Sequence, residues 1–408
     1  MSAHSPSRMR RDDGAVAILV ALVAVVLFVM AAFTVDFGYA YSVKRQLSVA
    51  SDAAAIAGAK AVNALLPYGT ACKQADADYG EPLQVAAQSA AEQTNDSNDP
   101  AHPNEVGTVT VTCTSNGVEV MVPNSRTLGT VFGGVIGVKT MTPATSATAL
   151  LTVPPAYGGV RPIAACVSDV KVATAARSEY VVFIDKIAGA CDTASTGNWA
   201  WTDFTDQGQY DDNYTDPCGG GGGPSGGNTG CLSAWLRYGY GGSVKVPNNY
   251  AQPPTAPLNK TGMHANTGWD NAVMPDVRSL VGKTILLPVV TGMYVSTGLN
   301  KTRLDVVGMA AVEVCSVNEG SGSPPPTIFP STWQTITTPG CNAMAPAGSP
   351  ADTTPPAELT LWNNFKNNGA AIWVHPVTYA TTGVYGPGGC KIGDTTCDFG
   401  ARGIVLWR

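Results

Sequence analysis

The fold is decided by the stretch Ala15 to Val35, which reads AVAILVALVAVVLFVMAAFTV. It carries no charge, and at 1.5 Å per residue a helix of this length covers the roughly 30 Å hydrocarbon core of a bilayer. A cleaved signal peptide is the rival interpretation, but its apolar region is usually only about 7 to 15 residues long. The length therefore favours a retained transmembrane helix over residues 15–35.

Basic residues are distributed unequally around this segment. The preceding residues 1–14 contain three arginines. The far side begins with Asp36 and reaches Lys44 and Arg45 only later. Because basic residues are retained on the cytoplasmic side, we expect a cytoplasmic arm over residues 1–14 and an extracytoplasmic location for the chain after the span.

The helix is not expected to stop at the membrane surface. Residues 36–66 contain strong helix formers, and the first proline after the span is Pro67. One continuous rod of about 50 residues, roughly 75 Å long, is predicted. Small side chains recur along this extension at spacings of three and four, at Ala50, Ala53, Ala54, Ala57, Gly58 and Ala61. They permit close approach by another helix, or they pack on the chain's own domain, and the sequence leaves both alternatives open.

The segment from Arg10 to Val62 resembles the N-terminal module of the TadE/TadG-like proteins of Flp (tight adherence) pilus assembly. The shared features are an Arg-rich start, a Gly, the apolar span, an acid followed by Gly, an Arg-x-x-Leu-like step and an Asp-Ala-Ala-Ala-x-Ala-Gly-Ala run. The resemblance implies roles in anchoring and helix contact for Gly14, Asp36, Gly38, Arg45, Leu47, Asp52, Ala54, Ala57 and Gly58. A looser likeness to TadG-type members continues in residues 197–204, 281–290 and 304–314. Pilin-like members that are cleaved after the Gly carry Glu five residues later, whereas this chain has Leu19 at that position. The resemblance therefore does not imply cleavage after Gly14.

The composition indicates strands, turns and disulfides in the exported part. All ten cysteines follow the apolar segment, which predicts cystines in an oxidising compartment. By proximity in the sequence we pair Cys218 with Cys231, Cys315 with Cys341 and Cys390 with Cys397, although ten cysteines allow many connectivities.

Two regions are expected after the helix. Residues 67–155 predict a small α+β region with a helix within residues 75–94, a hairpin over residues 106–123, a short apolar helix over residues 126–138 and a strand-like segment over residues 139–153. Residues 156–408 predict a β-rich exported region with core strands near residues 181–184, 284–290 and 304–314. The fold class is therefore α+β, with one long N-terminal transmembrane helix followed by an exported, β-rich, disulfide-stapled region.

Two stretches of residues 199–240 invite a binding role. Aspartates that could bind calcium, or form an exposed acidic loop, are Asp203, Asp206, Asp211, Asp212 and Asp216. Rings that could form a glycan or protein contact surface, or pack in the core, are Trp199, Trp201, Tyr210, Tyr214, Trp235, Tyr238 and Tyr240.

The sequence offers no catalytic motif. Neither HExxH nor CxxC occurs, and the three histidines after the span are widely separated, so no catalytic, cofactor-binding or metal-binding residue is expected. The chain has no basic cluster beyond its N-terminal arm, which argues against nucleic acid as a partner. The resemblance implies a membrane-anchored, non-catalytic structural or assembly component of a Flp/Tad-type pilus or secretion apparatus. Its implied partners are Tad-type membrane proteins, the lipid bilayer and, in a homo-oligomer, a second copy of the chain. The alternative is a cell-surface adhesin or glycan-binding protein.

Overall fold

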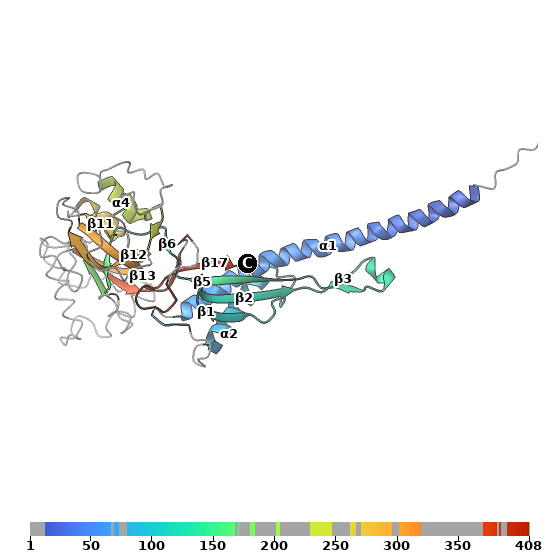
Figure 1. Ribbon diagram of the computed structural model, residues 1–408, viewed down its shortest axis with the longest axis horizontal. Coiled ribbons are helices and arrows are strands. Elements are labelled where there is room, and N and C mark those ends of the chain that lie inside the picture. The colour runs from blue at the N-terminus through green and yellow to red at the C-terminus, as the bar shows by residue number, and fades with distance from the viewer. Residues whose placement is uncertain are drawn as a thin grey trace, which may run out of the picture.

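A computed structural model shows an elongated molecule (Figure 1). The structure describes residues 13–66, 69–72, 80–167, 170, 180–183, 201–204, 229–246, 262–266, 271–295, 302–319, 370–381, 383–384 and 390–407. One long helix projects from one end, a small α+β region packs along the second half of that helix, and a β-rich region lies at the other end (Figure 1). The predicted α+β class with a long N-terminal apolar helix is confirmed.

The long helix, α1 (Asp13–Leu65), is unbroken over its 53 residues. At 1.5 Å per residue its length is about 80 Å. It lacks an internal proline, and Pro67 is the second residue after its end. The extension of the apolar segment into one continuous rod is therefore confirmed.

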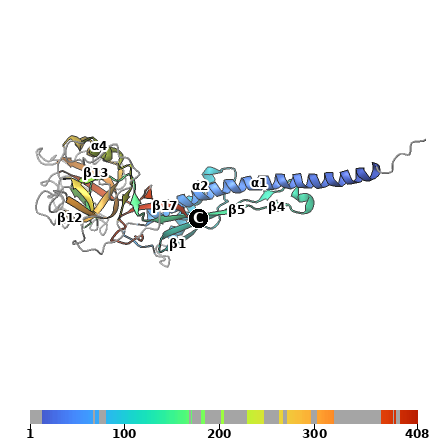
Figure 2. The ribbon, with the colours of Figure 1, turned by 45° about the horizontal axis from the view of Figure 1, so that its top comes forward.

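The region packed on α1, called the helix-packed region, consists of two helices on one face of a five-stranded sheet (Figure 2). The second helix is α2 (Gly80–Asn98), which extends past the predicted end at residue 94. The strand order is β1-β2-β5-β17-β15, antiparallel except for the parallel pair β15/β17. The strands are β1 (Thr110–Thr114), β2 (Gly117–Ser125), β5 (Ala144–Thr152), β15 (Tyr379–Thr381) and β17 (Ala401–Trp407). Alternate β2 residues, Val118, Val120 and Val122, are buried in the same core as the α1 and α2 side chains.

The predicted hairpin is present as β1 and β2. Thr114 lies opposite Gly117 across its turn. Gly117 has φ +144°, and a Cβ there would lie 2.0 Å from the carbonyl oxygen of Leu151 on the next strand. The turn therefore requires glycine for both its conformation and its close approach to β5.

The predicted apolar helix over residues 126–138 is wrong except for one turn. This segment instead forms a two-stranded ribbon of β3 (Leu128–Gly129) and β4 (Thr140–Met141), with a single 3₁₀ turn, η1 (Gly133–Ile136), at its tip. Glycines at positions 129, 133, 134 and 137 disfavour a longer helix. Gly137 ends η1 in the left-handed conformation, with φ 88°. Figures 1 and 2 show the ribbon running alongside α1, away from the sheet.

The distal region is built on a larger sheet with the order β7-β12-β13-β11-β9, in which β14 also pairs with β13 and β8 with β14. Its strands are β7 (Ala165–Cys166), β8 (Tyr180–Phe183), β9 (Trp201–Asp203), β11 (Gly262–Asn266), β12 (Thr284–Val295), β13 (Thr302–Glu319) and β14 (Ala370–Pro376). The predicted core strands near residues 181–184, 284–290 and 304–314 correspond to β8, β12 and β13.

Smaller elements complete this region. A three-stranded sheet with the order β10-β6-β16 consists of β6 (Ala156–Tyr157), β10 (Val244–Lys245) and β16 (Gly383–Val384). The helical elements are α4 (Thr229–Tyr238), η2 (Asn271–Val273) and α5 (Met274–Arg278).

The chain returns to the helix-packed region at β15 and then through β17. This strand pairs with β5 over Gly403 to Trp407, and it ends beside α1 (Figure 1). The domain boundary expected near residues 155–160 stays a prediction. A boundary there would place β5 and its partner strand β17 in different domains.

Two disulfides join described cysteines. Cys72 bonds to Cys113 and ties the connection after α1 to β1. Cys390 bonds to Cys397, which is one of the pairs proposed from the sequence. Cys231 and Cys315 are also disulfide-bonded, but their proposed partners Cys218 and Cys341 lie outside the described residues.

Candidate membrane anchor and contact surfaces

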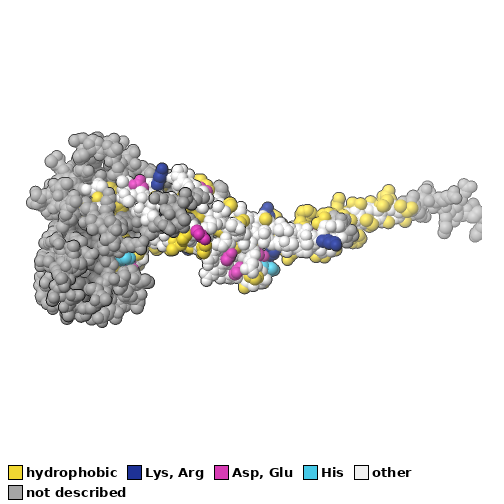
Figure 3. Space-filling view, turned by 90° about the horizontal axis from the view of Figure 1, so that it is seen from below, with side chains coloured by type: hydrophobic (Ala, Val, Ile, Leu, Met, Phe, Trp, Pro, Cys, Tyr) yellow, Lys and Arg dark blue, Asp and Glu magenta, His cyan; other side chains and the backbone are white. Residues whose placement is uncertain are grey.

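The first half of α1 presents large apolar side chains to its surroundings on every side. The exposed ones are Val16, Ile18, Leu19, Val20, Leu22, Val23, Val25, Val26, Leu27, Phe28, Val29, Met30, Phe33 and Val35. Figure 3 shows hydrophobic side chains over this projecting end of the helix. A helix that packs on a soluble domain exposes a polar face instead. This helix is long and apolar enough to cross a membrane.

Aromatic side chains mark the end of the apolar segment. Phe37, Tyr39 and Tyr41 are all exposed. The rings of Phe33 and Phe37, one turn apart, stack with 5.9 Å between their centroids. Aromatic residues are enriched at membrane interfaces, so these positions have the chemistry of an interfacial belt.

Asp36 joins α1 to the tip of the β3–β4 ribbon. Its carboxylate is buried and accepts hydrogen bonds from three consecutive backbone N–H groups. Val131 donates to Oδ1 at 2.9 Å, while Phe132 and Gly133 donate to Oδ2 at 3.0 and 2.7 Å. Hydrogen bonds to an ionised acceptor are stronger than neutral ones, and consecutive N–H groups form a natural anion site. The acid that follows the apolar segment therefore fixes the ribbon tip at this level of the helix.

An apolar groove lies between the ribbon tip and the helix. Its lining is Val25, Phe28, Val29, Ala32 and Phe33 from α1, Phe132 and Gly133 from the tip, and Asp36 at the junction. From Val25 to Asp36 the groove follows α1 for about 16 Å at the helical rise of 1.5 Å per residue.

The second half of α1 uses its small residues for contacts within the chain. Ala54 is fully buried in the core that α1 shares with α2 and β2. A Cβ built on Gly58 would lie 3.1 Å from Cγ1 of Val120 and 3.3 Å from the carbonyl oxygen of Ala87 in α2. Leu47 is buried in a smaller cluster that includes Leu128 of β3. The small-residue face is thus occupied by the chain's own domain.

The remaining anchor residues implied by the resemblance lie elsewhere on α1. Gly14 lies at its start, and Gly38 is exposed with open space where a Cβ would stand. Arg45 is exposed, whereas Asp52 and Ala57 are half-buried. The structure therefore brings Asp36, Leu47, Ala54 and Gly58 into contacts within the chain and leaves Gly38 and Arg45 on the surface.

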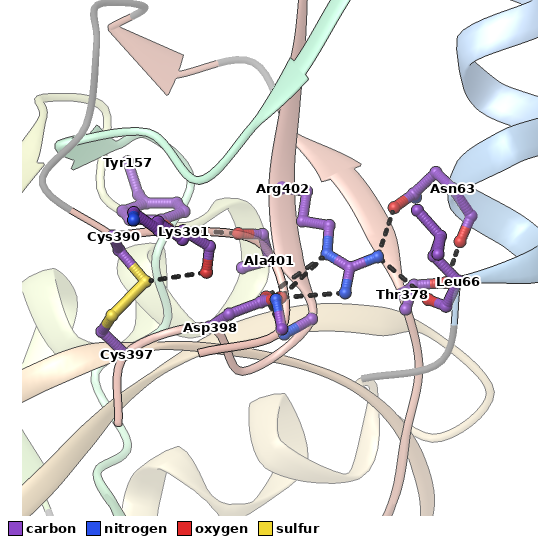
Figure 4. A network of polar contacts seen from close by, with 12 residues as sticks. Asn63, Leu66, Tyr157, Thr378, Cys390, Lys391, Cys397, Asp398, Ala401 and Arg402 are labelled. Atoms are coloured by element: carbon purple, nitrogen blue, oxygen red, sulfur yellow. Dashed lines mark hydrogen bonds and ion pairs between the residues drawn. A yellow bond between two sulfur atoms is a disulfide. The ribbon is translucent and has the colours of Figure 1, made fainter. Parts of the chain in front are cut away.

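A buried polar network ties the C-terminal end of α1 to β17 (Figure 4). Arg402 and Asp398 are fully buried and form an ion pair at 2.9 Å. The same guanidinium donates to the carbonyl oxygen of Leu66 at 2.9 Å and to Oδ1 of Asn63 at 3.3 Å. Thr378 donates to the carbonyl oxygen of Asn63 at 3.1 Å. Sequence reasoning missed this network, because its partners on α1 and β17 are more than 330 positions apart.

Within the aromatic stretch, the described rings divide between core and surface. Trp201, Trp235 and Tyr240 are buried, and Phe204 packs against both Trp235 and Tyr240 with centroid distances of 5.2 and 4.8 Å. Tyr238 is 79% exposed. Trp199, Tyr210 and Tyr214 lie outside the described residues.

The acidic stretch lies almost entirely beyond the described part of the chain. Asp203 belongs to β9, whereas Asp206, Asp211, Asp212 and Asp216 lie outside the described residues. Among the residues that the structure describes, no group of three or more His, Cys, Asp or Glu side chains could hold a metal ion.

Comparison with known proteins finds a match for the N-terminal segment. Residues 14–61 match the model of the family described as "Putative Flp pilus-assembly TadE/G-like". The matched segment contains both the exposed apolar half of α1 and most of its packed half. It confirms the resemblance seen in the sequence over this part of the chain. No curated protein and no solved structure matches the chain.

Proposed function

We propose that the chain is a membrane-anchored, non-catalytic structural or assembly component of a Flp/Tad-type pilus or secretion apparatus. The observation that carries the proposal is the TadE/G-like match over residues 14–61. It falls on a helix whose first half exposes apolar side chains all round, and lipid supplies the apolar surroundings that such a surface needs. The lipid bilayer is therefore the first partner.

The proposed orientation places the N-terminus in the cytoplasm and the rest of the chain outside it. The three arginines before the span support this direction. The disulfides Cys72–Cys113 and Cys390–Cys397 support an oxidising compartment for the regions after it.

Contacts with Tad-type membrane proteins, or with a second copy of the chain, are proposed for the exposed faces of α1. Ala54 and Gly58 are already covered by the chain's own α2 and β2. Met30 within the apolar segment and Val49 beyond it remain exposed, on a helix that projects from the body. A photoreactive residue at either position can therefore reach a partner protein.

Photocrosslinking in intact cells of the source organism tests this proposal. A photoreactive residue is placed at Met30, at Val49 or, as a matched control, at the fully buried Ala54. Capture of Tad-type membrane proteins from Met30 or Val49, but not from Ala54, is the expected result. Capture of copies of the chain alone would contradict the contact with Tad-type membrane proteins and leave a contact between copies. If Met30 and Val49 capture nothing, the assembly role is contradicted and the alternative of a cell-surface adhesin or glycan-binding protein gains support.

A further inference from the structure

We infer that the tip of the β3–β4 ribbon, residues 130–138, is a second membrane contact that inserts into the bilayer interface beside α1. The inference rests on the proposed membrane anchoring of α1. The tip is far from α1 in the sequence, yet Asp36 holds it against the helix.

The tip exposes apolar side chains that the folded protein does not use for packing. Val131 is 71% exposed, Phe132 43% and Val138 45%. The sequence from residue 127 to residue 138 carries no charge, and the first charged residues on either side are Arg126 and Lys139. Arg126 is held by Glu105 and Asp99, whereas Lys139 is exposed beside the tip. An uncharged apolar tip next to an exposed cation has the composition of an interfacial segment, because cations favour the headgroup layer.

The depth of the tip in the bilayer follows from its contact with Asp36. Asp36 comes directly after Val35, the last residue of the apolar segment. The hydrogen bonds from Val131, Phe132 and Gly133 to Asp36 are 2.7 to 3.0 Å long, so the tip backbone lies at the level where the span ends. Phe132 lines the groove that continues along α1 to Val25. The apolar side of the tip is therefore continuous with the apolar surface of the anchor.

Several backbone N–H groups of the tip also have hydrogen-bond partners, as an apolar environment requires. Besides the three N–H groups bound by Asp36, Thr130 donates its N–H to the carbonyl oxygen of Lys139 at 3.1 Å. Val138 donates to the carbonyl oxygen of Gly133 at 2.9 Å. Gly137 donates to the carbonyl oxygen of Gly134 at 3.3 Å. Unpaired backbone groups make an irregular loop costly to place in lipid, and these pairings remove much of that cost.

Lipid is the occupant that these observations favour for the groove and the tip. The exposed rings of Phe37, Tyr39 and Tyr41 mark the interface at the same level of α1. The tip, the groove and the exposed half of α1 thus form one uninterrupted apolar surface. A bilayer covers such a surface as a whole, whereas a single partner helix would cover one side of it.

Depth-dependent fluorescence quenching tests the inference. An environment-sensitive fluorescent amino acid replaces Val131, Val29 or Val49 in separate full-length proteins. Each is reconstituted in phosphatidylcholine vesicles whose acyl chains carry bromine near the headgroup or near the bilayer centre. Val29 lies inside the apolar segment, and Val49 is an exposed position of α1 beyond it.

The expected result is loss of roughly half of the emission at position 131 with the shallow quencher, strong quenching at position 29 with the deep one, and none at position 49. Quenching at position 29 with an unquenched position 131 would overturn the ribbon contact and leave the anchor in place. An unquenched position 29 would instead overturn the membrane anchoring itself. Emission at position 131 could instead change with the protein-to-lipid ratio and be unaffected by bromine. That result would show that the tip contacts a second copy of the chain, and it would also overturn the inference.

Discussion

The two halves of α1 are one uninterrupted helix, but they meet different surroundings. The first half carries large apolar side chains that remain exposed, whereas the second half buries small ones such as Ala54, Ala55 and Ala59 against α2 and the sheet. Hydrophobicity alone therefore does not locate a protein core. Large apolar side chains that stay exposed indicate that something outside the chain packs against them. Small buried side chains indicate that other parts of the same chain pack against them.

The change between the two halves falls at Asp36. This acid is buried by contacts from the ribbon, whereas Val35 before it and Phe37 after it are exposed. Substitutions at packed positions should therefore cost more stability than substitutions at exposed positions of the same elements.

The largest effect is expected from Arg402→Ala, at the end of the packed half. The substitution leaves Asp398 buried without its cation and removes a donor from the carbonyl oxygen of Leu66. Loss of one partner of a buried ion pair costs about 3 to 5 kcal/mol. The free energy of unfolding, measured by urea titration of the full chain in detergent, should fall by this amount. Lys60→Ala, at an exposed position of α1, is the control, and an equal effect of the two substitutions would show that the network does not stabilise the fold.

A matched pair of glycine substitutions compares an open position of α1 with a packed one. Gly58→Leu forces a side chain toward Val120 and the carbonyl oxygen of Ala87, and overpacking of this kind costs about 1 to 3 kcal/mol. Gly38→Leu enters open space, and the better helix propensity of leucine should stabilise the chain by up to about 1 kcal/mol. Urea titration of both variants should give shifts of opposite sign. Shifts of the same sign would contradict the assignment of Gly58 to the packed face and Gly38 to the open one.

The smallest effect concerns pH at the end of α2, which packs on the second half of α1. Hydrogen bonds from His102 and from Arg126 hold the pKa of Asp99 below its ordinary value. A carboxyl whose pKa is lowered by folding adds stability above its ordinary pKa of about 3.9, and this contribution disappears as the pH falls through the lowered value.

The comparison of Asp99→Asn with the native chain checks this sign. The difference in urea midpoint should be present near neutral pH and should shrink at acidic pH, once Asp99 of the native chain is protonated. Glu81→Gln, at an exposed position in the first turn of α2, serves as the control. A difference that grows as the pH falls would contradict the lowered pKa.

Local features of the sequence predicted much of this architecture. The apolar segment, the rod that continues it, the β1–β2 hairpin and the central strands β12 and β13 all follow from composition, proline positions and alternation within short windows. The features that escaped prediction are long-range. The ribbon tip reaches Asp36 from 95 to 97 positions away, and the Cys72–Cys113 disulfide spans 41. Nothing within a local window distinguishes these partners from other polar residues or cysteines.

The ribbon shows how a local rule can mislead. Residues 126–138 have the apolar content of a short helix, but four glycines weaken helix formation and Asp36 offers an acceptor for the N–H groups of Val131 to Gly133. A resemblance identified Asp36 as a residue of the module. Its partner could be found only in three dimensions.

The pairing of β17 with β5 also constrains the order of assembly. Asn63 at the end of α1 and Arg402 in β17 are 339 positions apart. Because a protein is synthesised from its N-terminus, α1 and the strands up to β5 are complete long before β17 exists, so β5 keeps an open edge while the whole distal region is made. Contacts of such high sequence separation form slowly, and unpaired strand edges are prone to aggregation. The five-stranded sheet is therefore completed only after β17 has been made, and until then the edge of β5 is open to pairing with another chain.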